Sequence, residues 1–270
     1  MPLLDLNGKT IDVMVQGAGP ALLLIHSSGM PAMQWRSVAT HLLDRFTIIA
    51  PNLHGYGRTA AWPADAPLDL ELELDLLDLV ADQYEQPLHV VGHSYGGLLA
   101  LAFLRRRPAR VATLSLIEPV ILGALRSEGE DRSLGEVERM AMGFFRAYEA
   151  GDTNRAMEGF VDYWYGDGAW QKIPQAQRLP IFTRARKMYL EIQAIWADRV
   201  PLADYRSIDQ PTLLLVGERT TPAARRMAHL LADAVAGALL LALPGAGHMS
   251  PLTHGDLVAD AVRAHIAEHS

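Results

Sequence analysis

The stretch between residues 89 and 106 constrains the fold of this chain more than any other. A short apolar run, 89–91, ends in Gly-His-Ser-Tyr-Gly-Gly at residues 92–97, and a helical pattern follows at once. In a sharp strand–turn–helix connection the residue at the apex has a strained backbone, and glycine neighbours leave the space that the turn needs. A glycine-rich turn that carries a serine by chance is the alternative, but the flanking pattern fits on both sides. The stretch therefore predicts a nucleophile elbow with Ser94 at its apex.

Apolar runs recur along the rest of the chain and alternate with helical patterns. They predict strands at residues 21–25, 46–50, 111–117, 212–216 and 239–243, and an edge strand at 10–15. Continuous apolar runs are typical of strands that are covered on both faces of a parallel sheet, with helices as crossovers. Residues 68–75 alternate leucine with acidic residues as a strand would, yet good helix formers favour a helix over about 69–84. The expected fold class is therefore α/β with a mostly parallel central sheet.

Residues 121–205 differ in character from the segments on either side. They are helical in pattern, polar and aromatic, and they contain no strand-like run. We therefore expect an α/β core formed by residues 1–120 and 206–270, with residues 121–205 inserted as a helical cap. The aromatic and glycine-rich stretch 162–170 suggests a rigid apolar lid, although aromatic residues at helical spacing also serve as the core of such a cap.

Charge and composition exclude several classes of function. The net charge of −7 argues against nucleic acid or an anionic membrane as the main partner. The chain has no cysteine, which excludes disulfides, thiolate catalysis and cysteine-based metal sites. No metal-binding constellation and no nucleotide fingerprint occurs, so we expect neither a metal nor a cofactor. The first residues do not resemble a signal peptide and no apolar run approaches a membrane span, so we expect a cytoplasmic protein without membrane insertion. We further expect a monomer or a homodimer.

A base for the serine is found near the end of the chain. A serine hydroxyl needs a base to take its proton, and the base needs an orienting partner. His248 is the candidate, because it lies in a Gly-Ala-Gly-His turn directly after the last predicted strand. His54 and His254 also lie in loops and are weaker alternatives. The sequence therefore pairs Ser94 with His248.

Four motifs together resemble the α/β-hydrolase family: the elbow, the loop that starts at His26, the loop 51–57 and the turn 245–248. The resemblance extends over the whole chain, and the order of serine before histidine agrees with it. It implies the α/β-hydrolase fold and a serine esterase-like enzyme with a helical cap. The family hosts many substrates, so the resemblance implies the type of mechanism more than the substrate.

The resemblance also implies an oxyanion hole, in which two backbone N–H groups face the developing negative charge. One N–H comes from Tyr95, the residue after the nucleophile. The other comes from Ser28, which occupies the donating position of the loop after strand 21–25. Ser27 stands where the family usually has glycine.

The acid of the triad departs from the family pattern. The family usually has aspartate shortly after the strand at 212–216, and this chain has the uncharged Thr220 there. Glu118, at the end of strand 111–117, is the favoured substitute, because a carboxylate at the buried end of a central strand is costly without a partner such as an imidazole. Glu218 in a shifted loop is the second possibility. The third is a protein without a functional acid, which would be a weak enzyme or a binding module.

These residues predict a cofactor-free serine hydrolase that cleaves a small or medium apolar carboxylic ester through an acyl-enzyme. The candidate substrate-binding residues flank the site and are Met30, Trp35, Trp164 and Met249. Hydrolysis of a C–C bond or a lactone by the same triad is the nearest alternative, and a non-catalytic ligand-binding homologue is the alternative from another class. A serine at the nucleophile position argues against dehalogenases and epoxide hydrolases, which use aspartate there.

Overall fold

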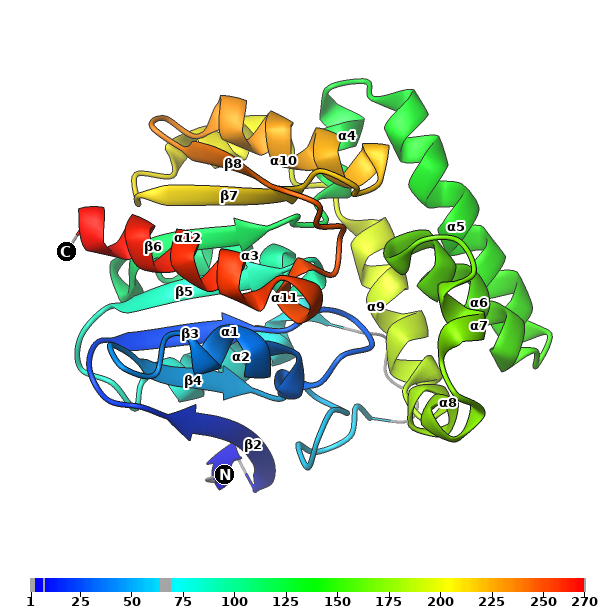
Figure 1. Cartoon of the computed structure of the whole chain (residues 1–270), viewed down its shortest axis with the longest axis horizontal. Helices are drawn as coiled ribbons and strands as arrows, with labels where there is room; N and C mark the ends of the chain where they lie inside the picture. The colour runs from blue at the N-terminus through cyan, green and yellow to red at the C-terminus, as the bar shows by residue number, and fades with distance from the viewer. Residues whose placement is uncertain (1–2, 7, 64–68, 270) are drawn as a thin grey trace.

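A single mixed sheet organises the computed structural model, which describes residues 3–6, 8–63 and 69–269. Its strands follow the order β1-β2-β4-β3-β5-β6-β7-β8 (Figure 1). β2 pairs antiparallel with β1 and with β4, and all other neighbours are parallel. The expectation of a mostly parallel sheet is confirmed. The strands are β1 Leu3–Leu6, β2 Lys9–Gln16, β3 Ala21–Ile25, β4 Thr47–Pro51, β5 Leu88–His93, β6 Val111–Ile117, β7 Thr212–Gly217 and β8 Leu239–Leu243.

Helices cover both faces of the sheet. In β3, Leu23 and Ile25 pack into the core on one face and Leu22 and Leu24 into the core on the other, as the two-residue period of a strand requires. The first core is covered by α2 (Leu70–Ala81), α3 (Tyr95–Arg106) and α10 (Pro222–Ala234). The second is covered by α1 (Arg36–Thr40) and α12 (Gly255–Glu268). Short helical turns complete the connections: η1 Ala32–Trp35, η2 Pro108–Arg110, η3 Leu202–Ser207 and α11 Ser250–Thr253.

The ambiguous segment near residue 70 is a helix, as its composition predicts. Asp69 caps the start of α2, because its side chain accepts a hydrogen bond from the Glu71 N–H at 3.0 Å. Leu74, Leu77 and Ala81 are buried on one side of the helix. Helical spacing of buried residues therefore outweighs the local alternation of leucine with acidic residues. The predicted edge strand is β2, but β1 pairs outside it, so β2 is not at the edge.

Six α-helices follow β6 before η3 and β7, and they lie together beyond the ends of the parallel strands (Figure 1). We call them the helical insertion; they are α4 Leu122–Ser127, α5 Asp131–Glu149, α6 Thr153–Tyr165, α7 Ala169–Lys172, α8 Gln175–Phe182 and α9 Ala185–Ala197. The two ends of the insertion meet. The Gly123 N–H donates to Asp198 Oδ2 at 2.8 Å, and the Leu202 N–H donates to Ser127 Oγ at 3.0 Å.

Candidate active site

The predicted elbow has the backbone that its sequence implies. Ser94 lies between β5 and α3 with φ 55° and ψ −116°, a conformation that residues other than glycine rarely adopt. A Cβ atom at Gly92 would collide with the carbonyl oxygen of Gly96, and one at Gly96 would collide with that of Ile25. Both glycines are therefore required by close backbone contacts, and the strain at Ser94 is held in place by its surroundings.

The predicted base and the favoured acid lie in contact. His248 Nδ1 is 2.6 Å from Glu118 Oε2, although 130 residues separate them in the chain. Their side chains are 2% and 0% exposed. Glu118 follows β6 directly and has a left-handed backbone with φ 44°. A buried acid is therefore aligned with the imidazole from the end of β6.

Three donors surround the Glu118 carboxyl group. Besides His248 Nδ1, the Gly217 N–H donates to Oε1 at 2.8 Å and the Thr220 hydroxyl donates to Oε2 at 2.5 Å. Thr220, at the position where the sequence comparison with the family expects an acid, is therefore a hydrogen-bond donor to Glu118. Buried carboxylates need such donors, because burial removes their water.

Glu218, the second candidate acid, lies elsewhere. Its side chain is exposed, and Oε2 accepts a hydrogen bond from the Gly245 N–H at 2.8 Å. It braces the loop that leads to His248 and does not contact the imidazole. The geometry therefore favours Glu118 over Glu218.

Two rings enclose the imidazole of His248. Trp164 of α6 stacks on it with 4.0 Å between ring centroids and an interplanar angle of 29°. On another side, His93 Nε2 donates to the backbone oxygen of His248 at 2.9 Å, while His93 Nδ1 lies 3.4 Å from Gln34 Nε2. Burial, followed by the neighbouring His248, holds the pKa of His93 well below its usual value. A neutral His93 therefore fixes the loop of His248, a role that its variable place within the elbow motif did not indicate.

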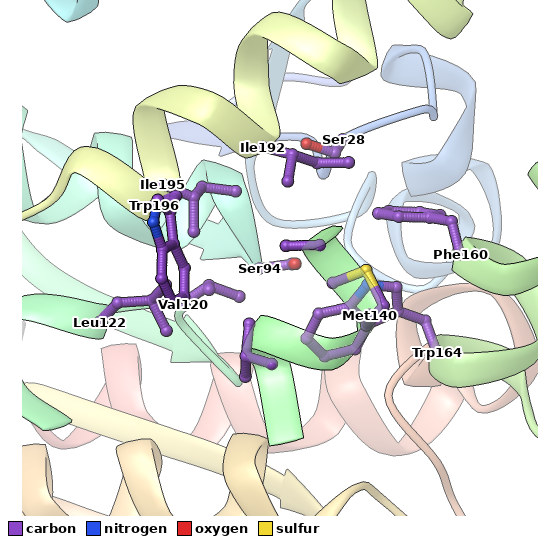
Figure 2. Close-up of a pocket in the computed structure, with 12 residues that line it drawn as sticks. Ser28, Ser94, Val120, Leu122, Met140, Phe160, Trp164, Ile192, Ile195 and Trp196 are labelled. Carbon is purple, nitrogen blue, oxygen red and sulfur yellow. The ribbon is translucent and has the colours of Figure 1, made fainter. Parts of the chain in front are cut away.

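The Ser94 hydroxyl forms no hydrogen bond within the described residues. In ligand-free sites the contact between nucleophile and base is often long and tightens when substrate binds. Figure 2 shows the Ser94 oxygen in the middle of a pocket whose wall includes Ser28 and Trp164. Ser94 thus faces the space beside Trp164, the ring that stacks on His248.

The loop of the predicted oxyanion hole is anchored at its start. Gln34 Oε1 accepts from the N–H and the hydroxyl of Ser27 at 3.2 and 2.8 Å. His26 Nε2 accepts from the Leu53 N–H at 3.0 Å, and its Nδ1 donates to the Ser27 oxygen at 3.0 Å. The other predicted donor, the Tyr95 N–H, is the first of α3, and the first N–H groups of a helix have no partner within it.

The anchoring role of His26 makes the stability of the protein dependent on pH. Burial lowers the pKa of His26 to about 4, so the folded protein keeps this ring neutral while the unfolded chain takes up a proton below about 6.5. The stabilisation is therefore complete above pH 6.5 and is lost as the pH falls toward 4. When the pH falls from 7 to 4.5, the unfolding free energy of the wild type should drop. The drop should be about 2–3 kcal/mol smaller in His26→Gln, which has no imidazole to protonate at this position.

Urea unfolding at the two pH values measures this difference. His229→Gln is the matched control, since His229 is exposed on α10, and it should show the same loss as the wild type. Equal losses for His26→Gln and the wild type would contradict the proton linkage at His26.

Ser94 and Ser28 face a narrow, apolar cavity of about 20 Å³ (Figure 2). This volume holds about one water molecule. Charged side chains are absent among the described residues that line it. Helices α5, α6 and α9 of the insertion supply most of the wall, which consists of Ser28, Ser94, Val120, Leu122, Val137, Met140, Ala141, Phe160, Trp164, Ile192, Ile195 and Trp196.

Two further spaces adjoin this cavity. An apolar cavity of about 40 Å³ shares Ser28 and Phe160 with the first and is also lined by Met30. On the outside, a groove of about 650 Å³ shares Trp164 with the first cavity and has polar walls that include Thr220. Trp164 therefore separates the serine from the groove.

The candidate substrate-binding residues divide into two pairs. Met30 and Trp164 line these spaces, and their contact with a substrate stays a prediction. The prediction for Trp35 is wrong, because η1 directs its ring into the core on the α1 and α12 face, where it is completely buried. Met249, the residue directly before α11, is also buried and lines none of the three spaces. The wall residues of the insertion, such as Phe160 and Ile192, were missed because an apolar helix face does not reveal which element it packs against.

The described residues contain no group of three or more His, Asp or Glu side chains that is arranged to hold a metal ion. In the same part of the chain, none of the helices is both long and apolar enough to cross a membrane.

Known proteins share this sequence pattern and this fold. A sequence profile described as "Alpha/beta hydrolase family" matches residues 22–261. The 2-hydroxymuconate semialdehyde hydrolase of Pseudomonas sp. (strain CF600) is 28% identical over 93% of this chain and 88% of that protein. The pimeloyl-[acyl-carrier protein] methyl ester esterase of Chromobacterium violaceum is 28% identical over 94% of this chain and 95% of that protein.

Solved structures agree on the fold. The esterase EaEST from Exiguobacterium antarcticum superposes with a TM-score of 0.75 at 19% identity and covers 97% of both chains. A hydrolase from Pseudomonas aeruginosa PA01 superposes with a TM-score of 0.77 at 22% identity, over 98% of this chain and 97% of that one. The strained serine, the buried histidine–glutamate pair and the sheet order are thus found in a chain that belongs to the alpha/beta hydrolase family.

Proposed function

We propose that the protein is a serine hydrolase that cleaves a small, apolar carboxylic ester through an acyl-enzyme. The observation that carries the proposal is the 2.6 Å contact between His248 and Glu118 beside the narrow apolar cavity that Ser94 faces. Esterases among the relatives and neighbours are consistent with it. A buried acid, a base and a strained serine are the parts that acyl transfer needs.

The proposed reaction runs in two halves. Ser94 Oγ attacks the ester carbonyl while His248 Nε2 takes its proton, and Glu118 stabilises the imidazolium through Nδ1. The N–H groups of Ser28 and Tyr95 hold the oxyanion. The imidazolium then gives its proton to the departing alkoxide, which leaves as an alcohol. Water then attacks the acyl-enzyme while His248 takes its proton, and the imidazolium returns this proton to Ser94 Oγ as the acid leaves.

The two apolar cavities suggest how such an ester is held. Both reach Ser28, so a carbonyl at the oxyanion hole would extend one substituent into each, on either side of Phe160. Their volumes of about 20 and 40 Å³ favour short groups. Because the insertion supplies most of the walls, we propose that residues 121–205 act as a cap that must shift for substrate to enter through the outer groove beside Trp164.

Hydrolysis of a C–C bond by the same residues is the second candidate. It is suggested by the similarity to a 2-hydroxymuconate semialdehyde hydrolase. Muconate-type substrates carry a carboxylate, and the lining residues of both cavities are uncharged. Burying a carboxylate without a cation is costly. The uncharged walls therefore favour the apolar ester.

A fluorophosphonate probe tests whether the protein is an enzyme of this class. We expect one covalent adduct, at Ser94, because the probe reacts with an activated serine and its tetrahedral adduct uses the oxyanion hole. Mass spectrometry of the labelled peptide locates it. Ser94→Ala should remove both the label and ester turnover.

The same preparation decides between the substrate classes. We expect p-nitrophenyl acetate and butyrate to be cleaved faster than the octanoate, and 2-hydroxymuconate semialdehyde to be cleaved slowly. An unlabelled Ser94 would exclude the serine hydrolase and favour a ligand-binding homologue. Faster turnover of the semialdehyde than of the short esters would favour C–C hydrolysis.

A further inference from the structure

A buried ionic cluster lies beside the site and takes no part in the proposed reaction. Lys187 of α9 reaches into the core, where Nζ lies 2.6 Å from Glu73 Oε1 and 3.1 Å from Glu191 Oε1. Glu73 Oε2 lies 3.1 Å from His54 Nδ1. All four side chains are almost completely buried. Removing charges from water costs free energy that the attraction within a buried ion pair only partly offsets. A contribution to stability therefore does not explain why the chain has this cluster.

The cluster continues to the loop of the oxyanion hole through Tyr56. Its hydroxyl donates to Glu191 Oε2 at 2.8 Å and accepts from the Gly29 N–H at 2.8 Å. A phenol has one hydrogen, so donation to Glu191 leaves the oxygen free to accept from Gly29. Burial, together with Glu191, raises the pKa of Tyr56 well above its usual value, so the hydroxyl keeps this proton.

Gly29 directly follows Ser28, the predicted oxyanion donor. Arg184, just before α9, donates to the Gly29 oxygen at 3.1 Å, so both polar backbone groups of Gly29 are held. On the other side of Ser28, His26 Nδ1 donates to the Ser27 oxygen at 3.0 Å, which holds the peptide group that carries the Ser28 N–H. The peptide groups on both sides of Ser28 are therefore fixed, and the one that follows Ser28 is held by Tyr56, whose hydroxyl donates to Glu191 of the cap.

The same cluster touches the second predicted donor. Lys187 Nζ lies 5.8 Å from the ring centroid of Tyr95 and 5.9 Å from that of Tyr56. Cations at this distance from an aromatic ring are attracted to it. Residues that contribute both oxyanion N–H groups are thus linked to one helix of the insertion, α9.

We propose that Tyr56 is a positioning residue for the oxyanion hole, which aligns the Ser28 N–H by accepting the Gly29 N–H while it is held by Glu191. The oxyanion hole is then complete only when α9 is seated, so closure of the insertion and activation of the site are one event. The inference rests on the proposed serine hydrolase mechanism.

Tyr56→Phe tests this role, because it removes one oxygen and keeps the ring. We expect kcat for p-nitrophenyl butyrate to fall about 10–100-fold with KM changed less than threefold, since the loss is felt where negative charge develops. Binding of a trifluoromethyl ketone, which forms a tetrahedral adduct with serine, should weaken by the same factor as kcat/KM. If Tyr56 had a purely structural role, Tyr56→Phe would change neither kcat nor the affinity for the trifluoromethyl ketone.

Tyr205→Phe is the matched control, since Tyr205 is a fully buried tyrosine in η3 outside the site, and its kcat should stay within twofold of the wild type. A folded Tyr56→Phe with wild-type kcat and inhibitor affinity would overturn the proposal. If Tyr56→Phe does not fold, Glu191→Gln serves instead: the amide oxygen accepts the Tyr56 proton less strongly, so a smaller fall in kcat is expected, and unchanged kcat would overturn the role.

Fluorophosphonate labelling of the wild type, run in the same series, separates this inference from the proposed function. A labelled, active wild type with a fully active Tyr56→Phe refutes only the role of Tyr56. An unlabelled wild type refutes the serine hydrolase, and the role of Tyr56 falls with it.

Discussion

Glu118→Gln is expected to lower kcat for ester hydrolysis by about 10³–10⁴-fold. The amide oxygen can still accept from the Gly217 N–H, but the amide nitrogen then faces His248 Nδ1, which lies 2.6 Å from Glu118 Oε2. An N–H donor at that place selects the tautomer with the proton on Nε2, which cannot accept a proton from Ser94. Steady-state kinetics with p-nitrophenyl butyrate measures the loss.

Glu218→Gln is the matched control, because this exposed carboxylate contacts the Gly245 N–H and not the imidazole. Its kcat should stay within about twofold of the wild type. A large loss in Glu218→Gln together with a fully active Glu118→Gln would show that the acid sits in the loop after β7.

Transfer of the acid from β6 to β7 is the second large effect that we expect. Thr220 Oγ1 lies 2.5 Å from the same Glu118 oxygen that contacts His248, so a carboxylate at position 220 can reach Nδ1. The kcat of the double variant Glu118→Gln/Thr220→Asp should be about 10²–10³-fold higher than that of Glu118→Gln alone. The reason is that a hydrogen-bond acceptor at Nδ1 restores the productive tautomer of His248.

Glu118→Gln/Thr220→Asn is the control for size and polarity, and it should recover nothing. The single variant Thr220→Asp should be less stable than the wild type, since two carboxylates then compete for one imidazole and like charges in contact are costly. Failure of the aspartate to recover activity, with the fold intact by circular dichroism, would show that the position after β7 no longer reaches the base.

The strands and the elbow follow from local sequence, because each depends on the properties of consecutive residues. The elbow requires glycine where backbones touch, so Gly92 and Gly96 reveal it without any knowledge of the rest. The contact between His248 and Glu118 could be anticipated because both residues follow strands of one parallel sheet, whose ends meet at one edge.

The walls of the site could not be predicted in the same way. Trp35 and Phe160 are both aromatic residues near functional segments. Trp35 packs into the core on the α1 and α12 face of the sheet, whereas Phe160 lines the two apolar cavities. Which side of a helix faces the serine depends on how the insertion docks, and no local pattern records that docking. The link from Glu191 through Tyr56 to Gly29 spans three distant segments and is visible only in the folded chain.

The meeting of the two ends of the insertion has a consequence for how this scaffold can diversify. A Cβ atom at Gly123 would collide with the backbone of Val200, so the chain leaves the core and returns to it at one point (Figure 1). β6 and β7, which flank the excursion, are already neighbours in the sheet. The helical insertion can therefore be exchanged for one of different length, by recombination or by engineering, without changing the order of the strands. Such an exchange would alter substrate specificity while the residues on the sheet stay the same.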